Sequence, residues 1–169
     1  SIGLFTIVMF IATSAFLSVV NLDRKSRSIR IASDNLNVSL EDISRRIKTG
    51  YSYYCGTLPD GAAFNATRDC TPGGESTMYF TDQNGERVKY TLDGLTHAIM
   101  RSVGSEPPIR ATSPEISIDG LKFFASGSTV APDSTQPMVV IIIDGSLGVA
   151  PSGTSFKIQT TVSQRAYDN

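Results

Sequence analysis

Only three residues of this 169-residue chain are histidines or cysteines. His97 is the single histidine, and the two cysteines are Cys55 and Cys70. A lone histidine acts as a general base only where a nucleophile and an orienting group meet it. The chain carries no nucleophile elbow, no phosphate-binding glycine loop and no zinc motif. The sequence therefore predicts a protein that is not an enzyme and has neither a cofactor nor a metal centre.

Asp82, Asn84 and Glu86 place three oxygen-bearing side chains at alternate positions, as a calcium-binding loop does. A calcium loop also needs a bidentate glutamate further along the chain, and that residue is missing here. Asn84-Gly85 is a strong signal for a β-hairpin turn. A turn is therefore the simpler interpretation of these residues.

The two cysteines can form a disulfide or remain free thiols, depending on the compartment in which the protein lies. In an exported protein Cys55 and Cys70 are expected to form a disulfide, which would contribute about 3 kcal/mol by restricting the unfolded chain. In a cytosolic protein they would be two buried free thiols.

The N-terminal segment, residues 1–22, contains no charged residue. Twenty helical residues span about 30 Å, which is the thickness of the hydrocarbon core of a bilayer. A signal-peptide core or a buried globular helix are the alternatives, but no cleavage site or polar break follows. We therefore expect a helix that lies in a membrane or among other apolar helices. The residues predicted to be buried there are Ile2, Leu4, Phe5, Ile7, Val8, Phe10, Ile11, Phe16 and Leu17.

The helix is predicted to continue to about residue 49 as an amphipathic rod. Apolar residues recur at spacings that place them on one helical face, whereas the opposite face is charged. Lys48 near the end and Gly50 just beyond it are helix stop signals. The residues predicted to pack this helix on a sheet are Leu22, Ile29, Leu36, Leu40, Ile43 and Ile47. The predicted division of the chain is a hydrophobic helix at 1–22, its amphipathic continuation at 23–50, a cysteine-containing loop at 51–75 and an antiparallel β region at 76–169.

Four basic residues, Arg24, Lys25, Arg27 and Arg30, follow the uncharged segment directly. They are interpreted as a solvated helix face near lipid headgroups, and charge pairing with a neighbouring subunit is the alternative. Taken alone, the positive-inside rule would place residues 24–30 in the cytoplasm. The overall net charge of −1 gives no field that would attract nucleic acid.

The β region contains two hairpin signals, Asn84-Gly85 and Asp93-Gly94. Two-residue loops would pair Val88 with Thr81, and Leu92 with Leu95. Asp82 and Arg87 would then form an exposed pair. These registers place one set of residues on a single face, which we expect to pack on the helix: Tyr79, Val88, Tyr90, Leu92, Leu95, His97 and Ile99. Further strands are predicted at 115–118, 121–126, 138–144 and 155–162, with the apolar run 138–143 as a central strand.

Residues 1–50 resemble the N-terminal helix of type IV pilins and type II secretion pseudopilins. This resemblance rests on Ser1–Ala12, which looks like the continuation of a pilin signature. The remainder of the chain resembles minor pseudopilins and minor pilins, and that likeness includes Ile43–Gly50, Ser113–Phe123 and Ile158–Arg165. It implies an α+β fold in which the long helix packs on an antiparallel sheet. The absence of proline from residues 1–58 is more similar to minor pilins and minor pseudopilins than to major pilins.

The resemblance also implies partners and a location. It implies a structural subunit held in the bacterial cytoplasmic membrane by a single pass, with its β region outside the cytoplasm. This subunit would join a cell-surface or periplasmic filament of other pilin or pseudopilin subunits. A prepilin peptidase would cut upstream of Ser1, and about eight to ten further mature residues would lengthen the helix by roughly 12–15 Å. The alternative is a signal-anchored extracytoplasmic binding module that does not polymerise.

Overall fold

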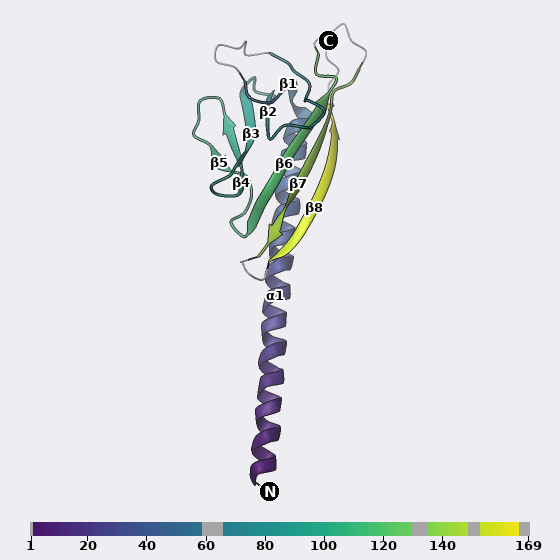
Figure 1. The fold of residues 1–169 in the computed structure, drawn as a ribbon. Helices are drawn as coiled ribbons and strands as arrows, with labels where there is room; N and C mark the ends of the chain where they lie inside the picture. Colours follow the sequence, from purple (N-terminus) through teal and green to yellow (C-terminus); the bar gives the residue numbers. More distant parts are fainter. Residues whose placement is uncertain (1, 59–65, 130–134, 149–152, 166–169) are drawn as a thin grey trace.

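The computed structural model describes residues 2–58, 66–129, 135–148 and 153–165. Ser1, the expected first residue of the helix, lies outside this part of the chain. A single long helix extends from a region of β-strands, which we call the head and which comprises the described residues from Tyr51 to Arg165 (Figure 1). The chain is thus α+β, as predicted.

Helix α1 runs without interruption from Ile2 to Thr49, a length of 48 residues. No proline occurs within it, so nothing removes a backbone donor or forces a kink. Arg46 and Lys48 lie in its last turn, and Gly50 follows at once. The predicted continuous rod, about 70 Å long by its helical rise, is therefore confirmed for the described residues.

The head contains two antiparallel sheets rather than the single sheet that was expected. The first has the order β1-β2-β3-β4-β5 and the second the order β6-β7-β8. The strands of the first sheet are β1 (Tyr51–Cys55), β2 (Thr77–Thr81), β3 (Arg87–Asp93), β4 (Ala98–Val103) and β5 (Ile109–Arg110). Those of the second are β6 (Ile116–Ser126), β7 (Met138–Leu147) and β8 (Thr154–Ser163).

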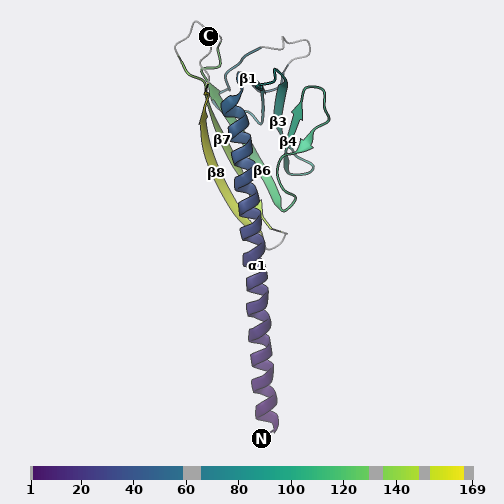
Figure 2. The same cartoon turned by 180° about the vertical axis from the view of Figure 1, so that it is seen from behind.

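The three-stranded sheet lies along the C-terminal half of α1, with β7 and β8 nearest the helix (Figures 1 and 2). Strand β7 is central, as its continuous apolar run predicted. The two strands predicted at 115–118 and 121–126 form one strand, β6, with a register shift between Ile118 and Gly120. Strands β7 and β8 make the closest contact with the helix, and Val88, Tyr90 and Ile99 from the face predicted to pack on the helix are buried in the core that the helix shares.

The first hairpin has a longer loop than predicted. The amide of Asp82 donates to the carbonyl of Glu86, and Thr81 pairs with Arg87, so residues 83–85 form the loop. Gly85 adopts a φ of 80°, which favours glycine. The carboxylate of Asp82 accepts hydrogen bonds from the amides of Asn84 and Glu86, each at 2.9 Å, and so stabilises this wider turn.

This one-residue change in register exchanges the two faces of β2 relative to β3. Phe80 pairs with Val88 and Met78 pairs with Tyr90, and all four side chains are buried. Tyr79 was predicted on this buried face, but it lies on the other face, where its ring contacts Lys89.

The second hairpin also has a longer loop, since Leu92 pairs with Ile99 rather than Leu95. The register differs from the prediction by an even number of residues, so Ile99 stays on the same face as Val88 and Tyr90. Leu95 and His97 leave the sheet for the turn, and Leu95 is 93% exposed. Their predicted packing on the helix is therefore wrong.

The segment after the helix is more ordered than the predicted loop at residues 51–75, because it begins with strand β1. Cys55 at the end of β1 forms a disulfide with Cys70. The amide of Cys70 donates to the carbonyl of Ala125 on β6, and Glu75 pairs with Phe123. This segment thus joins the two sheets of the head.

Arg87 has a structural role instead of the predicted exposed pairing with Asp82. Its side chain donates to the carbonyls of Ser52 and Ala66, at 2.7 and 3.0 Å, and to the hydroxyl of Thr81. Burial lowers the pKa of the Arg87 guanidinium from its ordinary value. Three polar oxygens therefore solvate this charge inside the head.

Candidate functional site

The most distinctive surface of the protein is the N-terminal half of α1. We call residues 2–22 the apolar stalk. All nine side chains predicted for a membrane or filament core are exposed, by between 55 and 81%. Met9, Val19 and Leu22 are exposed as well. Monomeric soluble proteins rarely leave so large an apolar patch in water, so this surface marks a contact with lipid or with protein.

The few polar side chains of the apolar stalk are compatible with such an environment. The hydroxyl of Thr13 donates to the carbonyl of Met9 at 2.8 Å, and that of Ser14 donates to the carbonyl of Phe10 at 2.9 Å. Thr6 bonds to Gly3 in the same way. These hydroxyl donors are satisfied within the helix and need no water. By length and composition α1 could cross a membrane.

The C-terminal half of α1 carries a buried stripe that holds the head. Leu36, Leu40, Ile43 and Ile47 are between 0 and 7% exposed, and Ile29 is half-buried against the same core. Ala32 is fully buried too, and the sequence analysis missed it, although steps of three and four residues from Ile29 to Leu36 pass through it. Leu22 is 64% exposed, so its predicted packing on a sheet is wrong. The head does not extend down the helix to Leu22, which belongs to the apolar stalk.

An ionic junction links the helix to the first sheet. The carboxylate of Asp42 lies 2.8 Å from Arg46 Nε, 3.4 Å from Arg45 Nη2 and 3.5 Å from Arg101 Nη1 on β4. Partial burial pushes the pKa of Asp42 up, but the hydrogen bonds and charges of the arginines outweigh burial, and the pKa is lower than its ordinary value. Nothing in the local sequence indicates Arg101 as a partner, because the pairing depends on how β4 meets α1.

The end of the helix is attached to the head by its own carbonyl groups. The hydroxyl of Tyr53 donates to the carbonyls of Ile47 and Gly50, at 2.6 and 2.9 Å. The amide of Arg165, beyond β8, donates to the carbonyl of Lys48 at 2.9 Å. These bonds satisfy carbonyls that a helix C-terminus otherwise leaves unpaired. The helix and the head are therefore joined firmly where they meet.

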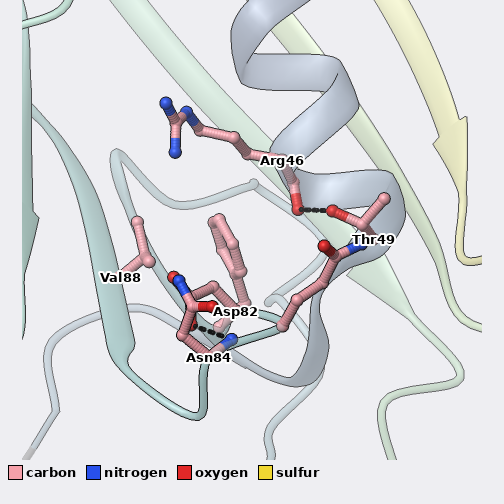
Figure 3. A pocket seen from close by; sticks show the side chains of 7 residues that line it. Arg46, Thr49, Asp82, Asn84 and Val88 are labelled. Carbon is pink, nitrogen blue, oxygen red and sulfur yellow. Dashed lines mark hydrogen bonds between the residues drawn. The ribbon is translucent and has the colours of Figure 1, made fainter.

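A small pocket lies between the last turns of α1 and the hairpin of β2 and β3 (Figure 3). Its volume is about 120 Å³, and Arg46, Thr49, Asp82, Asn84 and Val88 are among its lining residues. The Thr49 hydroxyl donates to the carbonyl of Arg46, and the Asp82 carboxylate is engaged in the turn. The Thr49 hydroxyl and the Asp82 carboxylate thus hold local structure.

The side chain of His97, the single histidine, is exposed. His97 lies in the turn between β3 and β4, with Nδ1 3.3 Å from the carbonyl of Ile118 and 3.5 Å from Asp119 Oδ1. The packing of His97 beside Tyr90 that the hairpin register predicted is therefore wrong. Within the described ranges, no group of three histidine, cysteine, aspartate or glutamate side chains could hold a metal ion.

The chain matches no protein-family profile, no curated protein and no solved structure. The apolar stalk, the buried stripe and the junction with the head are therefore the features on which a functional proposal has to rest.

Proposed function

We propose that this protein is a structural subunit, similar to a minor pilin or minor pseudopilin, of a type IV pilus-like or type II secretion-like filament. The observation that carries the proposal is the apolar stalk, whose nine predicted core residues are exposed on a helix that continues without a break into the head. Before assembly the stalk would lie in the membrane. After assembly it would pack among the stalks of other subunits.

The energetics support an apolar surrounding for the stalk. Burying one large apolar side chain contributes about 1.5–3 kcal/mol, and the stalk exposes twelve such side chains between Ile2 and Leu22. A helix this apolar is stable in lipid. Transfer into a bundle of similar helices from other subunits keeps it out of water and adds close packing between side chains.

The disulfide supports the location of the head. A bond between Cys55 and Cys70 persists in an oxidising compartment, which for a bacterial inner-membrane protein is outside the cytoplasm. The proposal therefore includes a single pass through the cytoplasmic membrane with an extracytoplasmic head. The positive-inside rule, applied to the basic residues at 24–30, predicts the opposite orientation in the membrane. In this proposal the disulfide has more weight than that rule, because the bond needs the oxidising side of the membrane.

A signal-anchored binding module would use the same anchor and the same head without polymerising. The two functions differ in what surrounds the stalk when the protein works. In a filament the neighbours of Phe10 are other stalks, whereas in an anchored module they are lipids.

The experiment replaces Phe10 with a photo-reactive phenylalanine analogue in the full gene, expressed in its host cells. Phe10 is 75% exposed, and the analogue keeps an aromatic ring at this position. Irradiation is expected to produce a ladder of cross-linked subunits, enriched in the sheared surface fraction or in periplasmic filaments.

The matched control places the same analogue at Leu95, which is even more accessible at 93% exposure but lies on the head. It tests whether any exposed position gives the same ladder. Cross-links from Phe10 to lipid alone, under conditions in which the cells make filaments, would refute the filament function and favour the anchored module.

A further inference from the structure

A group of exposed basic side chains follows the apolar stalk directly, and neither the head nor the proposed filament contact explains it. We call Arg24, Lys25, Arg27 and Arg30 the basic collar. All four residues are exposed. Arg27 forms an ion pair with Asp23 at 3.3 Å on the helix surface. Asp23 is the one acidic residue in positions 23–30, so this stretch has a net charge of +3.

The collar surrounds most of the helix. Successive helical residues are turned by about 100°, so the largest gap between neighbouring collar positions is about 140°. Ile29 lies in this gap, where it is half-buried and continues the stripe that holds the head. The charges thus occupy the sides of the helix that the head leaves uncovered.

The height of the collar follows from where the charged residues begin. Charged side chains are costly within the hydrocarbon core of a bilayer, so a helix that crosses the membrane with its uncharged segment has Asp23 and Arg24 at the edge of that core. Arg24 would therefore lie at the surface of the membrane, and Arg30 about 9 Å further out. That distance is about one Debye length at physiological ionic strength, so the whole collar would experience the charge of the headgroups.

We infer that the basic collar binds anionic phospholipid headgroups and gathers these lipids around the helix. A second copy of the chain would touch one side of the helix, whereas headgroups surround it, as the charges do. The inference rests on the membrane location within the proposed function, and it does not depend on filament assembly.

The test uses the full chain in phosphatidylcholine vesicles, with Val19→Trp as a reporter. The natural sequence has no tryptophan, and Val19 is 64% exposed within the stalk near the collar. A fraction of the lipid carries brominated chains, which quench tryptophan at contact distance. Comparing brominated phosphatidylglycerol with brominated phosphatidylcholine gives the relative association of the two lipids with the helix.

Two double variants of the Val19→Trp chain distinguish the effect of the collar charges from the effect of the overall net charge. Arg24→Gln with Arg30→Gln removes two collar charges, and Lys122→Gln with Lys157→Gln removes two exposed charges from the head. Each basic side chain near an anionic surface strengthens association by roughly fivefold. The collar variant should therefore lose at least about fivefold of the preference for phosphatidylglycerol at low salt. The head variant should keep the preference for phosphatidylglycerol. Added salt should reduce this preference both in the chain with Val19→Trp alone and in the head variant.

Equal quenching by the two lipids with the collar intact, or an equal loss of preference in the two variants, would overturn the inference. A preference that disappears as protein density in the membrane rises would instead assign the collar to a second copy. An absence of quenching by either lipid would mean that the stalk is not in the bilayer, which is a failure of the proposed function and distinct from the other results.

Discussion

Replacing Leu40 with alanine tests whether the buried stripe of α1 holds the head on the helix. Leu40 is 7% exposed and belongs to the core shared by the helix and both sheets. Truncating a buried leucine removes its transfer free energy and leaves a cavity, at a cost of about 2–5 kcal/mol. We expect a loss of about 3 kcal/mol in the free energy of unfolding, because Leu40 retains slight exposure.

The assay is urea unfolding of the full chain in detergent micelles, followed by near-ultraviolet circular dichroism of the tyrosines. Tyr53 and Tyr90 are almost completely buried in the head, so their signal reports the head even if the stalk stays helical in detergent. With a urea dependence of about 1.5 kcal/mol/M, a loss of 3 kcal/mol lowers the midpoint by about 2 M.

Val38→Ala provides the matched control on the same helix. Val38 is 67% exposed and lies off the stripe, and alanine is the better helix former. Its midpoint should therefore stay the same or rise slightly. If Leu40→Ala lowers the midpoint no more than Val38→Ala does, the stripe does not hold the head, and the reasoning from burial is refuted.

Two further predictions concern the junction and the second sheet. The lowered pKa of Asp42 means that its ion pairs stabilise the fold above the ordinary value of 3.8 and are lost as the pH falls below it. Asp42→Asn should therefore lower the urea midpoint at pH 7. It should also remove part of the decrease in the free energy of unfolding that the unmodified chain shows below about pH 4. An identical decrease at acid pH in both proteins would contradict this prediction. Gly145→Ala would bring a Cβ atom against the backbone carbonyl oxygen of Ser117 on β6, so it should reduce the free energy of unfolding by about 1–3 kcal/mol. Gly73→Ala, with no atom within 4 Å of the added carbon, should change it little in the same urea measurement, and equal effects would exclude the clash.

The periodic part of the sequence predicted the structure well. The long apolar and amphipathic helix, its end just before Gly50 and the central strand β7 all follow from patterns of neighbouring residues. The disulfide between Cys55 and Cys70 was predicted on condition of export, and the structure contains it. The helix and the strand depend on local hydrogen bonding and on the spacing of apolar side chains, which a single sequence displays.

The hairpins show where such reasoning fails. Asn84-Gly85 and Asp93-Gly94 marked the two turns, but not the lengths of their loops. The carboxylate of Asp82 stabilises a wider turn by accepting two amides, and the resulting shift buries Phe80 in place of Tyr79. A turn signal locates a reversal of the chain, whereas the register depends on which face of the strands the core accepts.

The sequence by itself determined that this protein has an apolar stalk, a helical stripe that packs on the head and a β-rich head. Each of these corresponds to a continuous run or a regular spacing of apolar residues along the chain. Only the tertiary structure decided that the second sheet covers the helix, that Arg101 pairs with Asp42, and that Leu22 remains exposed below the head. The physical reason is that these contacts join residues far apart in the chain. Their free energies depend on burial and distance, which exist only after the sheets have packed against the helix.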